Sequence, residues 1–517
     1  MITSYSALLW PGSTVTALYM LVLVAIILAL VVSLYRLFLH PLRAVPGPKL
    51  AAVTDFYRFY FDVFGDGMVK TIPELHERYH STVVRIGPNY VHVQDPQDYH
   101  KIFSRNSPFL KWGGFWHNRG GAALILSVTD PKRHRTMRAV MNPFFSKGAA
   151  DRLAKGFVRR LNKASDIMMQ QSQDGAPIDL LNLYRSLTCN TVAEVLLGES
   201  ELVPTGHRSD LLGVMDEIGS RSLLLLNFPF LQLVGAKIPP SIVDSLAPGL
   251  GFLREKCDAL IEKSHARGRD TPSAEKPCSM CEMLVEKNPV GALSTDMHRD
   301  LMQHMLQFLV PNTDSSAVTL SAAIFQVSQS PAMRHRLRSE LVNYTLDSDD
   351  WSSLMQLPYL TAVVKETLRM YPGLPGLLPR VVPTGGYTVG EQYLPAGVHQ
   401  PLRYLIYALH QNDKAYSEPT KFIPERWLVA SNNDRDRCFA PFQKGNHACI
   451  GTNLAYMQLY LGIAHMIKRF DLHLCEPVSS EWQWIDRAGA KPAWPVFTRV
   501  VKDHASTQAS HRSVTGV

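Results

Sequence analysis

Cysteine is scarce in this chain, which has seven cysteines in 517 residues, an odd number. Proteins that depend on disulfides carry more cysteines, usually in even number, so the composition favours a reducing compartment. One Cys-x-x-Cys pair, Cys278 and Cys281, is not followed by the second pair that a zinc site requires. The cysteine content therefore argues against both a disulfide framework and a zinc module.

Dense runs of Lys and Arg interleaved with aromatic residues are also missing, although the formal net charge is +8. Without such runs we expect no nucleic-acid binding. A basic chain with this ordinary content of charged residues suits work beside an anionic membrane or an acidic partner protein.

Charge is absent from the N-terminal segment, where no charged residue precedes Arg36 and residues 15–34 are almost wholly apolar. About twenty such residues cross a bilayer as a helix. A cleaved signal peptide is the alternative, but the segment lacks a basic start and an obvious small-residue cleavage site. We expect a transmembrane anchor at residues 15–36, preceded by a lumenal N-terminus at residues 1–14.

Three prolines follow the anchor within residues 37–50, and proline fixes the backbone and removes a hydrogen-bond donor. This segment is predicted to be a semi-rigid hinge. Arg36, Arg43 and Lys49 come after the span and no basic residue precedes it, so the rest of the chain should lie on the cytosolic side.

The most informative stretch is Phe442 to Gly451, which reads Phe-Gln-Lys-Gly-Asn-His-Ala-Cys-Ile-Gly. Gly445 and Gly451 allow the backbone to come close to the sulfur of Cys449, and Phe442 can shield that sulfur from water. An apolar helical pattern follows, and a helix N-terminus stabilises a thiolate. Cys449 is thus a candidate metal ligand, and the alternative is a buried structural cysteine.

This stretch resembles the ligand loop of the cytochrome P450 family, Phe-x-x-Gly-x-Arg-x-Cys-x-Gly. The resemblance implies that Cys449 is the axial ligand of the iron of haem b, in a loop shaped by Phe442, Gly445 and Gly451. His447 stands where the family has an arginine that binds a haem propionate. Because histidine is charged only near or below its pKa of about 6.5, haem anchoring by His447 should depend on pH.

Asp130 and Pro131 indicate the start of a helix that carries His134 and Arg138 four residues apart, on one face. In isolation this could be a solvated basic face. The family has a Trp or His and then an Arg at this spacing, which implies that both side chains hold a haem propionate. Arg380 precedes a glycine-rich turn and matches the strand arginine that also binds a propionate.

Residues 295–329 predict a long helix with Pro-Asn-Thr-Asp-Ser-Ser at its centre, similar to the oxygen-binding segment of the family. By this resemblance Asp314 and Ser315 are the catalytic acid and alcohol that deliver protons; a solvent-facing polar pair is the alternative. Pro311 and Asn312 occupy the two positions where the family has small residues. We expect Pro311 to kink the helix and Asn312 to place an amide over the haem.

Glu366 and Arg369 resemble the Glu-x-x-Arg motif of the family, and Arg426 matches the arginine that completes a buried ion network. We assign these three residues to folding of the haem site and not to catalysis. Residues 83–93 carry a strand-turn-strand pattern. Most other segments are helical in pattern.

The resemblance extends over most of the chain and predicts a haem-thiolate catalytic domain at residues 51–500, mainly α-helical with a smaller β region. The apolar residues 203–250 correspond to the mobile lid over the substrate channel, and residues 107–121 to part of the pocket roof. Residues 501–517 are polar and aperiodic, so we expect a disordered tail.

Family membership implies a monooxygenase that uses O2 and electrons from NADPH, delivered by NADPH-cytochrome P450 reductase, with cytochrome b5 as an optional second donor. Lys444, Arg435 and Arg437 flank the ligand loop and are candidates to meet an acidic reductase surface; a solvated cluster is the alternative. The chain is most similar to fungal members of the trichodiene oxygenase type. This implies an enzyme of the endoplasmic reticulum membrane that hydroxylates or epoxidises a lipophilic secondary metabolite, terpenoid or polyketide-derived.

Two other functions are compatible with the same motifs. A haem-thiolate isomerase or dehydratase would need no oxygen, and Pro311 and Asn312 favour this alternative. A non-catalytic haem-binding protein is the second alternative, and the retained Asp314 and Ser315 argue against it.

Overall fold

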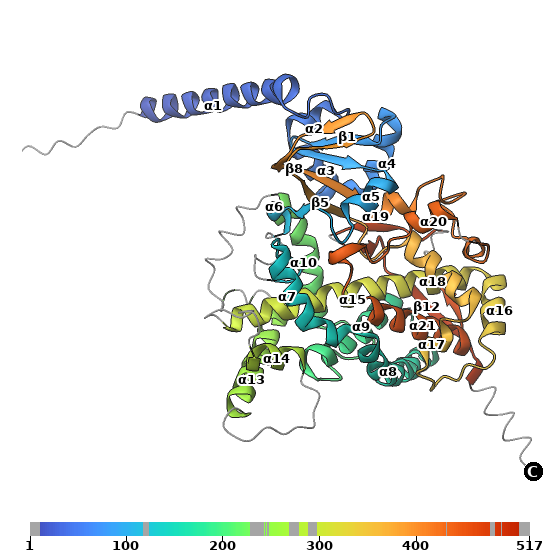
Figure 1. Cartoon of the computed structure of the whole chain (residues 1–517). Helices are drawn as coiled ribbons and strands as arrows, with labels where there is room; N and C mark the ends of the chain where they lie inside the picture. The colour runs from blue at the N-terminus through green and yellow to red at the C-terminus, as the bar shows by residue number, and fades with distance from the viewer. Residues whose placement is uncertain are drawn as a thin grey trace, which may run out of the picture.

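A computed structural model describes residues 11–116, 124–227, 242, 245, 248–267, 279–287, 297–430, 432–475, 481–487 and 489–505. Helices make up most of the domain, and a sheet lies at the end from which the N-terminal apolar helix projects (Figure 1). The predicted class, mainly α with a smaller β region, is confirmed.

The helices of the N-terminal half of the chain are the apolar helix α1, the short helices next to the first sheet, and the first long helices of the domain. They are α1 (Pro11–Leu34), the π-helical turn η1 (Tyr35–Leu39), α2 (Lys49–Val53), α3 (Phe56–Phe64), α4 (Met68–Tyr79), α5 (Pro96–Ile102), α6 (Gly113–Trp116), α7 (Pro131–Met141), the 3-10 turn η3 (Asn142–Phe145), α8 (Lys147–Gln173), α9 (Leu180–Leu197) and α10 (Asp210–Asn227).

The C-terminal half supplies the central helix and the helix that follows the cysteine loop. Its members are α13 (Pro248–Arg267), α14 (Met280–Lys287), α15 (Met297–Gln329), α16 (Pro331–Glu340), α17 (Trp351–Leu354), α18 (Pro358–Met370), α19 (Ile406–His410), the 3-10 turn η5 (Pro424–Trp427), α20 (Asn433–Cys438), the 3-10 turn η6 (Gly445–His447) and α21 (Thr452–Arg469).

The strands form one five-stranded sheet and three smaller units. The large sheet has the order β1-β2-β8-β5-β3, the second sheet has the order β4-β12-β9, and β6-β7 and β10-β11 are hairpins. Their bounds are β1 Val83–Gly87, β2 Tyr90–Val93, β3 Leu110–Lys111, β4 Ile178–Asp179, β5 Leu377–Val382, β6 Tyr387–Val389, β7 Gln392–Leu394, β8 Gly397–Leu405, β9 Phe470–Leu474, β10 Trp484–Asp486, β11 Ala490–Pro492 and β12 Phe497–Asp503.

Local sequence accounts for several element ends. Asp130 accepts a hydrogen bond from the backbone N–H of Arg133, and Pro131 occupies the first turn of α7, as predicted. Strands β1 and β2 pair antiparallel with Val83 opposite Val93, which confirms the predicted strand-turn-strand.

The apolar helix α1 continues into η1, and residues 15–39 are long and apolar enough to cross a bilayer. The proline-rich segment after it, predicted to be a semi-rigid hinge, packs closely on the domain. Leu42 and Val45 are buried against the first sheet, and the ring of His40 is hydrogen-bonded to Asn89 at 3.1 Å. Side-chain contacts with the first sheet, which composition does not reveal, therefore hold this segment in place.

Helix α15 runs through the middle of the domain as one long helix (Figure 1). It packs on α9 and α21, and most of its C-terminal half is buried in the main hydrophobic core. The helix continues without interruption through Pro311, so this proline does not end the helix.

Two predicted segments reach the edge of the described residues. Strand β12 ends at Asp503, so residues 501–503, assigned above to the tail, belong to a sheet because they pair with β9. The rest of the predicted tail, residues 506–517, lies outside the described residues. In the predicted lid, the structure describes α10 and the start of α13, while residues 228–241 lie outside the described part.

Candidate active site

The loop before α21 presents Cys449 at a strained and tightly packed turn. The backbone N–H of Cys449 donates to the carbonyl of Phe442 at 2.8 Å, and that of Ala448 donates to the carbonyl of Gly445 at 3.1 Å. Gln443 has a positive φ of 58°, which is uncommon for a residue with a side chain. The loop is therefore held in one conformation by its own backbone.

Both predicted glycines are required by close contacts. Gly445 has a φ of 73°, and a Cβ at this position would lie 2.1 Å from the carbonyl oxygen of Phe103. A Cβ on Gly451 would lie 3.1 Å from the Oδ1 atom of Asn312 and 3.9 Å from the sulfur of Cys449. Larger residues would push the loop away from α5 or from α15, because backbone and neighbouring side chains fill the space.

Cys449 itself is exposed, although surrounding protein atoms desolvate its sulfur. Desolvation raises the pKa of the Cys449 thiol, while hydrogen bonding from Gly451 and the charge of Arg138 oppose the rise. Phe442 lies beside the loop with its ring 5.0 Å from that of Tyr456, in an edge-to-face contact. The sulfur thus has the N–H donor of Gly451 and the cation of Arg138 near it. The rings of Phe442 and Tyr456 lie beside the loop.

A group of basic side chains surrounds the space next to this loop. Arg138 donates to the carbonyl of Ala448 and, at 3.2 Å, to the side chain of Asn142. Arg380 is 2 % exposed, and its guanidinium lies 4.4 Å from the centre of the Phe103 ring. Burial lowers the pKa of Arg380 to about 10, which still leaves it charged at neutral pH.

The two predicted histidines contact each other. His447 Nδ1 lies 3.2 Å from His134 Nε2, and the ring centres are 4.2 Å apart. Burial, with smaller effects from Lys111 and Arg138, lowers the pKa of His134 to about 3. The pKa of His447 is lowered well below its ordinary value, mainly by burial and then by Lys111. Both rings are therefore neutral at physiological pH.

Lys111 is a member of this group that the sequence analysis missed. It is 6 % exposed, pairs with Arg380 in the β3–β5 register, and donates to the carbonyl of Leu126 at 2.8 Å. Burial, followed by the charges of Arg380 and Arg138, lowers the pKa of Lys111 to about 7. Its place depends on pairing between strands that are about 270 residues apart in the chain, which no local pattern indicates.

The two predicted catalytic residues of α15 have different contacts. Ser315 shares a helix face with Asn312, whose oxygen is directed at Gly451, because residues three apart lie on the same side. Its hydroxyl donates to the carbonyl of Pro311 at 2.6 Å. The amide of Asn312 donates back to the carbonyl of Phe308 at 2.8 Å, so one of its N–H groups is tied to its own helix.

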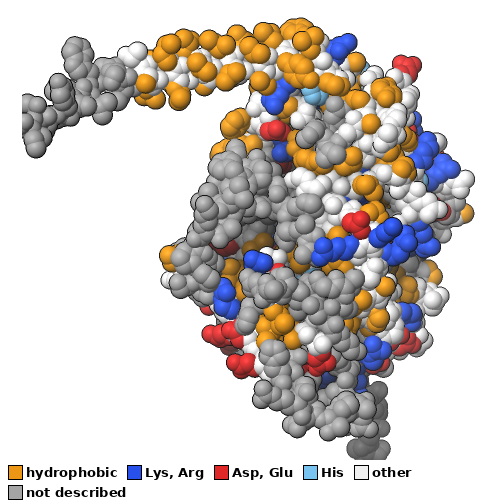
Figure 2. All heavy atoms as spheres, turned by 60° about the vertical axis from the view of Figure 1, so that its left-hand side comes forward, with side chains coloured by type: hydrophobic (Ala, Val, Ile, Leu, Met, Phe, Trp, Pro, Cys, Tyr) orange, Lys and Arg blue, Asp and Glu red, His pale blue; other side chains and the backbone are white. Residues whose placement is uncertain are grey.

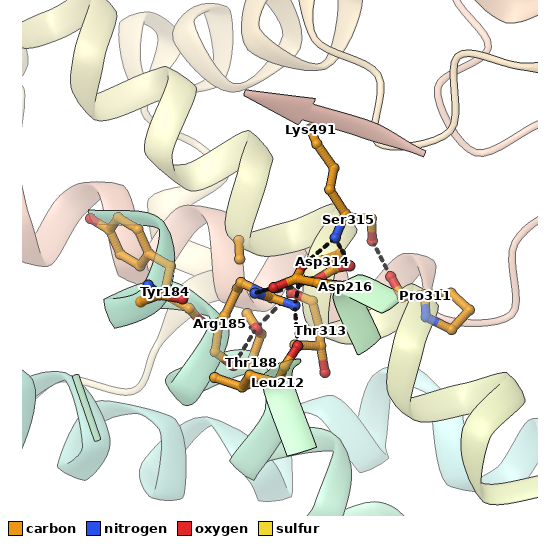
Figure 3. Close-up of polar contacts among 12 residues, drawn as sticks. Tyr184, Arg185, Thr188, Leu212, Asp216, Pro311, Thr313, Asp314, Ser315 and Lys491 are labelled. Carbon is orange, nitrogen blue, oxygen red and sulfur yellow. Dashed lines mark hydrogen bonds and ion pairs between the residues drawn. The ribbon is translucent and has the colours of Figure 1, made fainter. Parts of the chain in front are cut away.

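Asp314 takes part in an ion network that joins four elements (Figure 3). Arg185 of α9 lies 2.8 Å from one oxygen of Asp314, and Lys491 of β11 lies 3.4 Å from the other. The same two cations also contact Asp216 of α10. Arg185 and Asp216 are two further residues that the sequence analysis did not find, since they come from separate helices.

Comparison with known proteins identifies the family. The model of the cytochrome P450 family matches residues 56–485. The chain belongs to the cytochrome P450 family. It is 32% identical to the cytochrome P450 monooxygenase aneF of Aspergillus aculeatus over 92% of this chain and 97% of that protein.

Two further fungal relatives are similar over nearly their whole length. The cytochrome P450 monooxygenase phqM of Penicillium fellutanum is 33% identical over 91% of this chain and 89% of its own. The cytochrome P450 monooxygenase hkm5 of Aspergillus hancockii is 35% identical over 90% of this chain and 91% of its own.

The residues of this P450 fit the haem that the family carries. Among the described residues, no cluster of three or more His, Cys, Asp or Glu side chains can hold a bare metal ion. A metal bound to Cys449 therefore needs its other ligands from a cofactor, and a porphyrin supplies them. Lys111 and Arg380 are buried and Arg138 is half-buried, and these basic side chains can pair with the carboxylates of a porphyrin.

In this P450 the Glu366 network is fully assembled. Arg369 donates to both oxygens of Glu366 at 2.9 and 2.8 Å, and Arg426 donates to one of them at 3.1 Å. Glu366 and Arg369 are 0 % exposed, so loss of one partner would leave a buried charge at a cost of about 3–5 kcal/mol. Arg369 also donates to the carbonyls of His410 and Pro419, which ties this network to the loop before η5.

The expected reductase contact through Arg435 is wrong. Arg435 is buried and donates to the carbonyls of Arg426 and Val429, with its guanidinium 5.4 Å from the centre of the Trp427 ring. It supports the segment that carries Arg426 and is not available at the surface. Arg437 is exposed and Lys444 is half-buried.

Proposed function

We propose that the protein is a membrane-anchored monooxygenase that inserts one oxygen atom of O2 into a lipophilic secondary metabolite, terpenoid or polyketide-derived. The balanced reaction converts substrate, O2, NADPH and a proton into hydroxylated or epoxidised substrate, water and NADP+. The observation that carries the proposal is the exposed thiol of Cys449 at a tight loop, beside buried Lys111 and Arg380 and half-buried Arg138.

Cys449 would coordinate the iron of haem b, and the haem when bound supplies the chemistry of oxygen activation. Arg138, Arg380 and Lys111 would hold the two propionates by charge-assisted hydrogen bonds. His134 and His447 would contribute neutral hydrogen bonds, because burial keeps both rings uncharged. Phe442, Gly445 and Gly451 would keep the loop close and dry around the sulfur.

Asp314 and Ser315 would supply protons from α15. Ser315 is three residues from Asn312, which contacts the cysteine loop at Gly451, and it lies against Gly373, whereas Asp314 is held by Arg185 and Lys491. In this arrangement the hydroxyl of Ser315 would deliver a proton at the site. Asp314 would take up the proton that replaces the one delivered by Ser315. This proton would come from the solvent side, where the ion network of Asp314 reaches α10.

Electrons would come from NADPH through NADPH-cytochrome P450 reductase, with cytochrome b5 as an optional second donor. The exposed basic side chains of Lys132, Arg133 and Arg135 on α7, with Arg437, would meet an acidic partner surface. Residues 15–36 would anchor the enzyme in the endoplasmic reticulum membrane as a single span, with residues 1–14 lumenal and the catalytic domain, residues 51–500, cytosolic.

The experiment starts from the metabolites that accumulate when the gene is deleted. Each is incubated with the full-length holoprotein, reductase and NADPH under 18O2, and the product is analysed by mass spectrometry. The proposal predicts one 18O atom in the product and no turnover without O2 or NADPH. Turnover under anaerobic conditions without NADPH would instead support the isomerase or dehydratase alternative.

A further inference from the structure

We propose that Asn312 selects substrates that carry an O–H or N–H group next to the carbon that is oxidised, because its side chain presents a hydrogen-bond acceptor toward the cysteine loop. The inference rests on the proposed function, and the experiment below separates the two. It goes further by naming a specificity-determining residue and the class of ligand that this residue binds.

Asn312 lies at the centre of α15 with its side chain directed at the loop that carries Cys449. A Cβ placed on Gly451 would be 3.1 Å from Oδ1 of Asn312 and 3.9 Å from Sγ of Cys449. One small volume therefore borders both the amide oxygen and the sulfur. Groups that bind between α15 and this loop come within reach of Asn312.

The two ends of the Asn312 amide have different surroundings. Nδ2 donates to the carbonyl of Phe308 at 2.8 Å, and since a carbonyl only accepts, this contact determines which end of the amide is the nitrogen. Oδ1 accepts no hydrogen bond from the residues that the structure describes. Asn312 therefore presents an acceptor toward Gly451, and a ligand that pairs with it must bring a donor.

The acceptor of Asn312 is held in place before a ligand arrives. Phe308, whose carbonyl binds Nδ2, is buried, and its ring stacks on that of Phe145 with 5.3 Å between centres. The hydrogen bond from Nδ2 therefore ties the side chain to a fixed part of the helix. A group that is already in its binding position loses little conformational entropy when a ligand binds.

The residue before Asn312 removes a donor from the same part of α15. Pro311 has no N–H, so it cannot donate to the carbonyl of Gln307 one turn earlier, although the helix continues through it. Pro311 is exposed and Asn312 is half-buried, so a ligand can reach both residues. This stretch of the helix therefore offers a ligand an acceptor at Asn312 and no backbone donor at Pro311.

A single polar contact has a large effect on the recognition of a largely apolar substrate. Figure 2 shows hydrophobic side chains along α1, the helix proposed to bring the enzyme to lipophilic substrates. Among such substrates a hydrocarbon would leave Oδ1 of Asn312 unpaired, and a carbonyl or an ether would place two acceptors against each other. A hydroxyl or an N–H would pair with Oδ1, which favours substrates that carry one.

The test measures binding of two small iron ligands to the full-length ferric holoprotein at pH 8, without NADPH. Imidazole and 1-methylimidazole share a ring and coordinate haem iron through nitrogen, but only imidazole keeps an N–H that can donate. Changes in haem absorbance give both dissociation constants. Because no oxygen is inserted, the result does not depend on the outcome of the 18O2 experiment.

Three variants are compared with the natural protein. Asn312→Gly carries a small residue, as the family does at this position, and removes the acceptor. Asn312→Asp keeps an acceptor and removes the amide N–H groups. Asn343→Gly makes the same substitution at an exposed position after α16 and is the matched control.

Imidazole should bind Asn312→Gly about threefold to tenfold more weakly than it binds the natural protein, the range expected for one neutral hydrogen bond. 1-Methylimidazole should bind this variant at least as tightly as before, because the smaller residue only adds space. Asn312→Asp should bind imidazole at least as tightly as the natural protein does, and Asn343→Gly should bind both ligands unchanged.

Three results would overturn the proposal. The first is equal affinity of the natural protein and Asn312→Gly for imidazole. The second is weakening of both ligands by the same factor in Asn312→Gly. The third is a loss of imidazole affinity in Asn312→Asp as large as in Asn312→Gly, which would show that the amide of Asn312 acts as a donor.

Discussion

His447 and His134 form a hydrogen-bonded pair, with 3.2 Å between Nδ1 of the first and Nε2 of the second. The family has an arginine at the position of His447. A neutral ring therefore stands here in place of a cation. Burial lowers the pKa of His447, and the ring stays uncharged at neutral as well as at alkaline pH. A cation at this position is therefore missing over a wider pH range than the sequence alone indicates.

Replacing this ring with a cation should strengthen haem binding. The His447→Arg variant is expected to release haem to apomyoglobin more slowly than the natural protein at both pH 7 and pH 9, because the guanidinium adds a charge-assisted hydrogen bond to a propionate. His447→Gln, which keeps a neutral donor, is the control. Equal release rates for all three proteins would show that residue 447 makes no contact with a propionate.

Lys111 should contribute to haem retention as a cation at pH 6, where a group with a pKa of about 7 is mostly charged. In the Lys111→Gln variant we expect the haem dissociation rate to rise about tenfold or more, since a hydrogen bond to a charged group contributes about 1.5–3 kcal/mol. Lys101→Gln is the control, because Lys101 is exposed and its partner is Asp98. The same dissociation rate in both variants would contradict a propionate contact by Lys111.

Asp314 should affect how efficiently electrons are used. In the Asp314→Asn variant, slower proton delivery is expected to lower the amount of product per NADPH consumed and to increase release of hydrogen peroxide. Asp216→Asn is the control for the network, because it removes a carboxylate from the same two cations without altering α15. An unchanged ratio of product to NADPH in Asp314→Asn would refute the proton-delivery role.

The buried pair His76 and His92 should make the fold sensitive to acid. His76 Nε2 lies 2.6 Å from His92 Nδ1, and burial lowers the pKa of His76 to about 4 and holds the pKa of His92 well below its ordinary value. Because the unfolded histidines bind protons first, stability is fully present above pH 6.5. It falls as the pH drops below that value, by up to about 1.4 kcal/mol per pH unit for each ring.

The measurement for this pair is the urea midpoint of the holoprotein between pH 7.5 and pH 5. His92→Asn keeps a donor toward His76 and removes one titrating ring, so its midpoint should fall less steeply with pH. His473→Asn, at an exposed position of β9, should leave the slope unchanged. If His92→Asn has the slope of the natural protein, the pair does not titrate in this range.

Local sequence was sufficient for features that depend on neighbouring residues. The apolar N-terminal helix, the cap at Asp130 and the loop around Cys449 follow from apolar length, capping chemistry and glycine spacing, and the structure shows each of them. The network of Glu366 and Arg369 was also predictable, because the two residues are one helical turn apart.

Features that depend on distant segments could not be predicted in this way. Lys111 reaches the basic group through the pairing of β3 with β5, and Arg185 reaches Asp314 from another helix. Arg435 was misjudged because its charged neighbours suggested a solvated segment, whereas the contact with Trp427 buries it. Long-range packing decides all three positions, and a single sequence does not record it.

The most direct test of the central claim is the absorption spectrum of the reduced, carbon-monoxide-bound holoprotein in the Cys449→Ser variant. Cys475→Ser is the control, since Cys475 is a half-buried cysteine outside the ligand loop. The thiolate-type spectrum should be present in the natural protein and in Cys475→Ser and absent from Cys449→Ser. Persistence of that spectrum in Cys449→Ser would contradict the assignment of Cys449 as the haem ligand.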